Sequence, residues 1–242
     1  LCAVMIRKEY SNLTLRHALR QVEGRKRPYI TQLFYGTLEN YRCVRYQWED
    51  LVAKQPKDSI CVLMDMAVYE LLWMHTKPYA LINETIKLAK GRFASASGMI
   101  NALLRKVEQR GKRDLPKDGD EALSIQTSHP LWLIRMWNAQ YGKAVCEQIC
   151  KADMLPRKGC GRVNTLKTSR AELLKRDPRF SCGSIGNDSI TYDQGNLADT
   201  MWYQNGWITI QDKASQLVAP FLDPQPLERI LDVCSAPGTK AT

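Results

Sequence analysis

The chain has 242 residues, a formal net charge of +10 and a hydrophobic fraction of 44%. These proportions are ordinary for a folded globular protein, and no window offers the long uncharged apolar run that a membrane span needs. The positive charge is concentrated, because residues 1–112 hold 19 Lys and Arg against 10 Asp and Glu, whereas residues 113–242 hold 16 against 15. A basic segment joined to a near-neutral one favours a polyanion as partner, usually RNA or DNA; a basic domain without such a role is the alternative.

The eight cysteines do not have the spacing of a metal site. None forms a C-x-x-C pair, so we expect no structural zinc. Cys146 and Cys150 lie one helical turn apart and share a face if that segment is helical. Free, small apolar cysteines in a cytoplasmic protein explain the set better than a ligand cluster.

Residues 1–112 are predicted to form an all-α bundle of five or six helices. Apolar residues recur at helical spacing from Ile60 to Met74 and from Ile100 to Val107, which gives each segment one buried face. Pro28, Pro56 and Pro78 fall between or at the starts of helical stretches, where a missing N–H costs least.

A polar segment rich in Pro and Gly, 113–128, is predicted to be a linker, and 129–203 a small α+β domain. Within that domain we expect an amphipathic helix starting near Pro130 and running to Val145. A strand at 162–165, a helix at 169–176 and a strand at 189–192 follow.

Residues 204–242 are predicted to open an α/β, Rossmann-like domain. We expect a strand at 207–210, a helix capped by Asp212, and a buried strand at 228–232 that ends in a Gly-containing loop at 234–239. An acidic residue at a strand tip followed by a small-residue turn suits a nucleoside-bearing cofactor. A strand and loop without the rest of their sheet are no domain, so we expect the chain to be the front part of a longer enzyme.

Several segments resemble the bacterial ribosomal RNA small-subunit cytosine methyltransferase B family, also called RsmB or Sun. Four segments are similar to its helical first domain, which has the fold of the RNA-binding antitermination factor NusB: 10–19, 30–38, 78–90 and 100–106. Arg162-Val-Asn-Thr-Leu-Lys-Thr168 resembles the opening of its middle domain. Ile210-Gln-Asp-Lys-Ala-Ser-Gln-Leu-Val-Ala-Pro220 and Leu231-Asp-Val-Cys-Ser-Ala-Pro-Gly-Thr-Lys240 resemble the start of its catalytic domain.

This resemblance implies transfer of a methyl group from S-adenosylmethionine to carbon 5 of a cytosine in small-subunit ribosomal RNA. It also implies that one loop contacts the cofactor, and the matching residues are Cys234, Ser235, Ala236, Pro237, Gly238, Thr239 and Lys240. The family's two catalytic cysteines match no residue of this chain, so Cys234 is expected to line the loop rather than to act as nucleophile, and the chain alone is expected to be inactive. Thr239 stands where the family usually has a second Gly; it weakens cofactor binding only if that position needs a positive φ.

Two groups of residues are candidates for RNA contact in a chain that we expect to be monomeric. The first is a basic run at a helix end, consisting of Arg105, Lys106, Arg110, Lys112 and Arg113; it is either a phosphate track or a solvated helix terminus whose cations complement the helix dipole. The second is the pair Arg162 and Asn164, which either contacts RNA or fixes a turn. The alternative to a methyltransferase is a stand-alone RNA-binding or antitermination factor of the NusB type.

Overall fold

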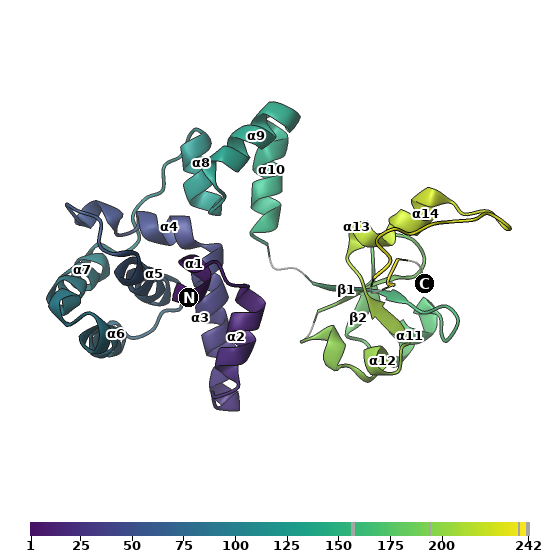
Figure 1. The fold of residues 1–242 in the computed structure, drawn as a ribbon, viewed down its shortest axis with the longest axis horizontal. Helices are drawn as coiled ribbons and strands as arrows, with labels where there is room; N and C mark the ends of the chain where they lie inside the picture. The colour runs from purple at the N-terminus through teal and green to yellow at the C-terminus, as the bar shows by residue number, and fades with distance from the viewer. Residues whose placement is uncertain (156–157, 194, 237, 241–242) are drawn as a thin grey trace. The chain divides into compact units, whose positions relative to one another are not determined.

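The computed structural model describes residues 1–155, 158–193, 195–236 and 238–240, and it divides the chain into two compact units, Leu1–Leu155 and Pro156–Thr242 (Figure 1). None of the helices within those ranges is long and apolar enough to cross a bilayer.

The first unit is helical throughout, as predicted for its first 112 residues. Its α-helices are α1 (Cys2–Met5), α2 (Ser11–Leu19), α3 (Arg27–Glu39), α4 (Tyr41–Tyr46), α5 (Asp58–Trp73), α6 (Pro78–Arg92), α7 (Ser97–Arg110), α8 (Asp120–Thr127), α9 (Leu131–Tyr141) and α10 (Lys143–Asp153). Short 3₁₀ turns lie at Gly24–Lys26, Glu49–Leu51 and Ala94–Ala96. Pro28 and Pro78 occupy the first turns of α3 and α6, where proline leaves no hydrogen bond unmade.

Helix α5 is the centre of this bundle and packs against α3, α4, α6 and α7. Met64, Ala67 and Val68 of α5 have no exposed surface, and neither do Ile100 and Leu104 of α7. The two apolar stripes of the sequence therefore face each other across one core, which confirms the helical periodicity.

A buried polar cluster joins α4 to α5. The Asp65 carboxylate, which is fully buried, accepts hydrogen bonds from Arg45 Nε at 2.8 Å and from Trp48 Nε1 at 2.9 Å. The Arg45 Nη2 to Asp65 Oδ2 distance is 2.5 Å, so the pair is bidentate. These bonds satisfy a carboxylate that would otherwise be costly to bury.

The predicted linker contains a helix. Residues 120–127 form α8, which packs on α4 and α9, and Ala122 and Ser124 are buried. Gly119 has φ 93° and lies directly before α8. Asp120 and Glu121 lie in the first turn, where their negative charges stabilise the helix by interacting with the positive end of its dipole. The Pro and Gly of residues 111–119 obscured this short amphipathic segment.

The helix predicted from Pro130 to Val145 is two helices, α9 and α10, which break at Gly142 with φ 81°. Ile134 of α9 packs with Cys146 and Cys150 of α10, and all three are fully buried. Both cysteines are free thiols on one face of α10, as expected. Both helices lie in the first compact unit, whereas the sequence predicts a middle domain over 129–203.

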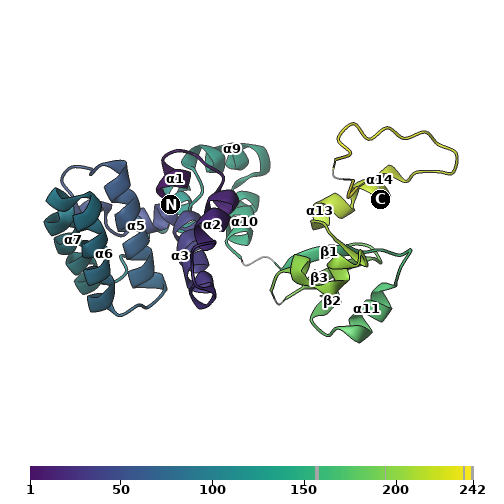
Figure 2. The same cartoon turned by 60° about the horizontal axis from the view of Figure 1, so that its bottom comes forward.

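The second unit is built on a four-stranded antiparallel sheet in the order β2-β3-β1-β4, of which Figure 2 labels β1, β2 and β3. Its elements are β1 (Gly159–Val163), α11 (Arg170–Arg176), β2 (Phe180–Cys182), β3 (Ser189–Tyr192), α12 (Met201–Gln204), β4 (Ile208–Ile210), α13 (Lys213–Gln216) and α14 (Val218–Leu222), with a 3₁₀ turn at Leu197–Asp199. Its core combines Val163, Ile190 and Ile208 of the sheet with Leu173 of α11 and Trp202 of α12. The structure thus confirms the type of three predicted elements: the strands at 162–165 and 189–192 and the helix at 169–176. The sequence did not predict β2.

Two predictions for residues 204–242 are wrong. The strand at 208–210 does not open a new sheet, because β4 pairs with β1, with Arg162 opposite Thr209. Residues 228–232 form no strand, and Ile230 and Leu231 are 54% and 84% exposed. A buried parallel strand needs hydrogen-bonded neighbours and apolar cover, and no described strand lies beside this segment. The Gly238 loop is therefore not at a strand tip here.

Candidate functional site

Some residues of the basic run at the end of α7 are held by hydrogen bonds or ion pairs to other residues of the protein, and others are exposed to solvent. Arg105 Nη1 bonds to Glu108 Oε2 at 2.9 Å, one turn along the same helix, and Lys106 is exposed. Lys112 is exposed as well, and its ammonium lies 4.6 Å from the centre of the Trp73 ring. This cation–π contact orients Lys112 without neutralising it.

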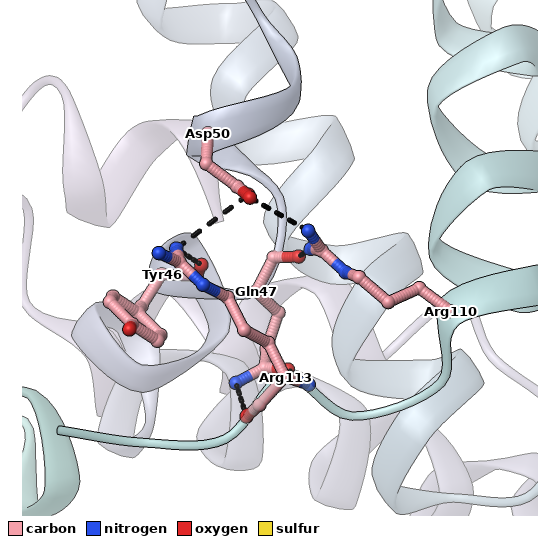
Figure 3. Close-up of polar contacts among 5 residues, drawn as sticks. All are labelled: Tyr46, Gln47, Asp50, Arg110 and Arg113. Carbon is pink, nitrogen blue, oxygen red and sulfur yellow. Dashed lines mark hydrogen bonds and ion pairs between the residues drawn. The ribbon is translucent and has the colours of Figure 1, made fainter.

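Arg110 and Arg113 join the end of α7 to the segment after α4 (Figure 3). Arg110 Nη1 bonds to Asp50 Oδ2 at 2.7 Å, and its Nη2 donates to the Gln47 carbonyl. Arg113 Nη1 lies 3.6 Å from Asp50 Oδ1 and donates to the Tyr46 carbonyl, and its guanidinium lies 3.9 Å from the centre of the Tyr46 ring.

Gln47, which is buried, completes this arginine clasp of Tyr46, Gln47, Asp50, Arg110 and Arg113. Its Oε1 accepts the Arg113 backbone N–H at 2.6 Å, and its Nε2 donates to the Arg113 carbonyl at 3.3 Å. Burial raises the pKa of Asp50, but the bond from Arg110 and the charges of both arginines outweigh it, so the pKa is lowered overall. The two arginines therefore have structural partners, which the spacing of the basic run could not reveal.

Asn164 fixes a turn. Its Nδ2 donates to the Gly206 carbonyl at 3.0 Å, and its Oδ1 accepts the Leu166 N–H at 3.1 Å. Its own N–H bonds to the Trp207 carbonyl at 2.8 Å, so both side chain and backbone connect the end of β1 to the segment before β4. Arg162 lies on β1, half-buried, opposite Ser189 and Thr209 of the neighbouring strands.

The predicted cofactor loop is an exposed turn. Cys234, Ser235 and Ala236 are exposed, and the Cys234 N–H bonds to Asp232 Oδ1 at 2.9 Å. Gly238 has φ 97°, a conformation that favours glycine. Thr239 is half-buried and Lys240 is exposed, and neither is among the residues with positive φ. Pro237 lies outside the described residues.

Two buried glutamines, Gln211 and Gln216, connect this loop to the sheet, and the sequence had not singled them out. Gln211 Nε2 donates to the Thr239 carbonyl at 2.9 Å. Gln216 Nε2 donates to the Gln211 carbonyl at 2.9 Å and to the Gly161 carbonyl of β1 at 3.2 Å. The Gln211 side-chain oxygen is buried and has no hydrogen-bond partner within the described part of the chain. Both glutamines flank Asp212, whose side chain caps α13 by accepting the Ala214 N–H, as predicted.

No three His, Cys, Asp or Glu side chains come together as a metal-binding group in the ranges that the structure describes. Of the free thiols there, Cys182 and Cys234 are exposed, and Cys43, Cys61, Cys146 and Cys150 are buried.

Comparison with known proteins gives matches in both units. Residues 1–109 match the NusB family, and residues 129–176 match a family described as the RsmF/B-like methyltransferase ferredoxin-like domain. The chain is 33% identical to a probable ribosomal RNA small subunit methyltransferase B of Bacillus subtilis, over 96% of this chain and 55% of that protein. It is 29% identical to the protein of the same name in Synechocystis, over 98% of this chain and 56% of the relative.

A solved structure described as PH0851 has a similar fold, with a TM-score of 0.66 and 22% identity over 93% of this chain and 54% of that one. The chain thus spans about half the length of the curated relatives that it matches.

Proposed function

Because this chain is related over nearly its whole length to the ribosomal RNA small subunit methyltransferase B proteins, we propose that it is part of an enzyme that methylates carbon 5 of a cytosine in small-subunit ribosomal RNA. The observation that carries the proposal is the 33% identity over 96% of this chain, a share too large to be confined to either compact unit. The expected location is the cytoplasm, and the expected state is a monomer.

The proposed cofactor is S-adenosylmethionine, which when bound supplies an electrophilic methyl group. Two observations support one wall of its site: Gly238 holds a positive φ, which would let the backbone approach a ligand closely, and Gln211 Nε2 donates a hydrogen bond to the Thr239 carbonyl. The proposed contact residues are Cys234, Ser235, Ala236, Gly238, Thr239 and Lys240, together with Pro237 outside the described residues. Thr239 does not have a positive φ, which supports the alternative that Thr in place of the usual Gly does not weaken cofactor binding.

Carbon 5 of cytosine becomes nucleophilic only after a thiolate adds to carbon 6 of the ring. We propose that this thiolate comes from beyond residue 242, since the resemblance assigns no residue here to that role. Residues 1–242 alone are therefore expected to be inactive.

RNA binding is proposed for the basic first unit, at Arg105, Lys106 and Lys112, and on the sheet at Arg162. Arg110, Arg113 and Asn164 are proposed to act on RNA binding indirectly, because their donors hold the arginine clasp and the turn after β1.

The test is methyl transfer by the full-length protein to small-subunit ribosomal RNA, followed by nucleoside analysis of the product. Deletion of residues 1–155 is expected to lower RNA affinity and to flatten its dependence on salt, because fewer phosphates are neutralised. RNA binding without any methyl transfer would favour the second candidate, a NusB-type RNA-binding factor, which the match over residues 1–109 supports. Unchanged binding after the deletion would contradict the proposed role of the first unit.

A further inference from the structure

A second basic surface lies on the first unit, away from the run at 105–113, and it involves α2 and the start of α3. A groove of about 410 Å³ is lined there by Asn12, Leu15, Arg16, Leu19, Arg20, Arg27 and Thr31. Three of these residues are arginines and none is acidic. Leu15 is buried, so the groove has an apolar floor beneath a cationic rim.

Exposed guanidinium groups form the rim of this groove. Arg16, Arg20 and Arg27 are exposed, and none is paired with a carboxylate in the part of the chain that the structure describes. Arg27 Nε donates to the Val22 carbonyl at 3.1 Å, which holds this side chain beside the groove while its charge stays uncompensated. Residues 11–31 contain five Arg and Lys and one carboxylate, Glu23, which gives a formal net charge of +4.

That single carboxylate is already engaged outside the groove. Glu23 Oε1 lies 2.5 Å from Arg25 Nε, and its Oε2 lies 3.4 Å from Lys26 Nζ. Arg16 and Arg20 are one turn apart at the end of α2, and like charges at that spacing repel each other on a helix. The dipole of α2 offsets this repulsion only in part, because it acts within the last turn and is screened by salt.

We propose that the groove between α2 and α3 binds the phosphate backbone of the RNA substrate through Arg16, Arg20 and Arg27. Exposed guanidiniums offer paired N–H donors that match phosphate oxygens, and Asn12 and Thr31 add neutral polar groups of the kind that contact phosphate or ribose. This inference rests on the proposed function, because it assigns a second contact surface for the same ribosomal RNA.

The test compares two double substitutions in the full-length protein. Arg16→Gln with Arg20→Gln removes two charges from the groove, whereas Arg25→Gln with Lys26→Gln removes two charges from residues of the same segment that face Glu23. Binding to small-subunit ribosomal RNA is measured across a salt series. Each lost phosphate contact lowers the slope of log affinity against log salt by roughly 0.7 for single-stranded RNA, so the groove variant is expected to bind about tenfold more weakly near 0.15 M salt. The control pair is expected to bind as the unchanged protein does.

Thermal unfolding of both variants checks that the exposed substitutions leave the fold intact. If the groove variant binds with unchanged affinity and slope, or if the control pair weakens binding equally, the groove assignment is overturned while methyl transfer by the unchanged protein still supports the proposed function. If the unchanged protein neither binds nor methylates ribosomal RNA, the proposed function fails, and the groove assignment fails with it.

Discussion

Asp177 is a single residue that joins three segments of the second unit. It follows α11, and its carboxylate accepts hydrogen bonds from Arg179 Nε at 2.9 Å and Nη2 at 2.7 Å. It also accepts from Trp202 Nε1 of α12 at 3.0 Å. The Arg179 side chain, with smaller contributions from the Arg179 N–H and Trp202, holds the pKa of Asp177 at about 2 against the effect of burial.

A depressed carboxyl pKa stabilises the fold above the unfolded value, near 4, and this stabilisation is lost as pH falls toward 2. Because Arg179 is half exposed and screened by solvent, we expect about 1–2 kcal/mol rather than the full value of the shift. Asp177→Asn should lower the free energy of unfolding at pH 7 by that amount and remove this acid dependence, as followed by tryptophan fluorescence in urea at several pH values. Asp199→Asn, at an exposed carboxylate nearby, is the control; an equal loss there would contradict the assignment.

We predict that Gln211 strengthens the binding of S-adenosylmethionine indirectly, by holding the loop at 234–240 in position. Gln211→Ala removes the hydrogen bond to the Thr239 carbonyl, a neutral bond worth about 1 kcal/mol, together with a longer bond to the Ser215 carbonyl at 3.3 Å. We expect about fivefold weaker binding of S-adenosylmethionine by the full-length protein, measured by calorimetry, and unchanged affinity for ribosomal RNA. Gln225→Ala is the matched control, because that exposed amide bonds to the Asp223 carbonyl, two residues away, and to no other residue that the structure describes. Equal effects of the two substitutions would contradict a positioning role for Gln211.

At the scale of elements, the approach of α3 to α5 depends on one glycine. A Cβ built at Gly36 would lie 2.0 Å from the Tyr69 hydroxyl and 2.1 Å from its Cζ. The Tyr69 ring is 8% exposed and stacks on Trp73 with centroids 5.7 Å apart, so it has little room to move.

Gly36→Ala is therefore expected to destabilise the first unit by about 1–3 kcal/mol, the usual cost of overpacking a core. Gly91→Ala on α6 provides the opposite case, since no described atom beyond its chain neighbours and its own helix backbone lies within 4 Å of the added Cβ. That substitution should stabilise by about 0.5–1 kcal/mol, because alanine is the better helix former. Thermal unfolding by circular dichroism measures both, and a loss of stability at Gly91 as large as that at Gly36 would refute the steric explanation.

Helices with a clear apolar periodicity could be predicted from their own residues, whereas short strands that are defined by pairing with a distant strand could not. The stripes from Ile60 to Met74 and from Ile100 to Val107 each bury one helical face, so periodicity alone placed α5 and α7. Phe180–Cys182 is three residues long and is defined by its pairing with β3, which no local pattern encodes. Residues 228–232 contain the apolar pair Ile230 and Leu231 but have no described partner strand, and the local sequence cannot supply one.

The candidate site shows the same limit. The sequence placed Gly238 where a positive φ is found and Asp212 where a helix is capped. It could not show that Arg110 and Arg113 meet Asp50 from some sixty residues away, nor that Gln211 reaches Thr239, because both contacts form only in the folded chain.

At the scale of the whole molecule, the first compact unit ends at Leu155, and the predicted domain end at residue 112 lies inside it. Truncation at 112 removes Arg113 from the arginine clasp and α8 from its contact with α4. We expect residues 1–155 to unfold cooperatively as an isolated fragment, and residues 1–112 to melt several degrees lower, since a loss of about 1 kcal/mol shifts the midpoint by about 2–8 °C for units of this size. Circular dichroism of the two fragments measures this, and equal midpoints would contradict the boundary.

The strand order β2-β3-β1-β4 has a consequence for how the protein emerges from the ribosome. β1 is synthesised first, yet its two neighbours are β3, which begins at Ser189, and β4, which ends at Ile210. β1 can therefore form no ladder with either neighbour until the chain beyond it has been made. The whole helical unit is thus synthesised while β1 is still without a partner, and we expect that strand to gain both its neighbours only when Ile210 has left the exit tunnel.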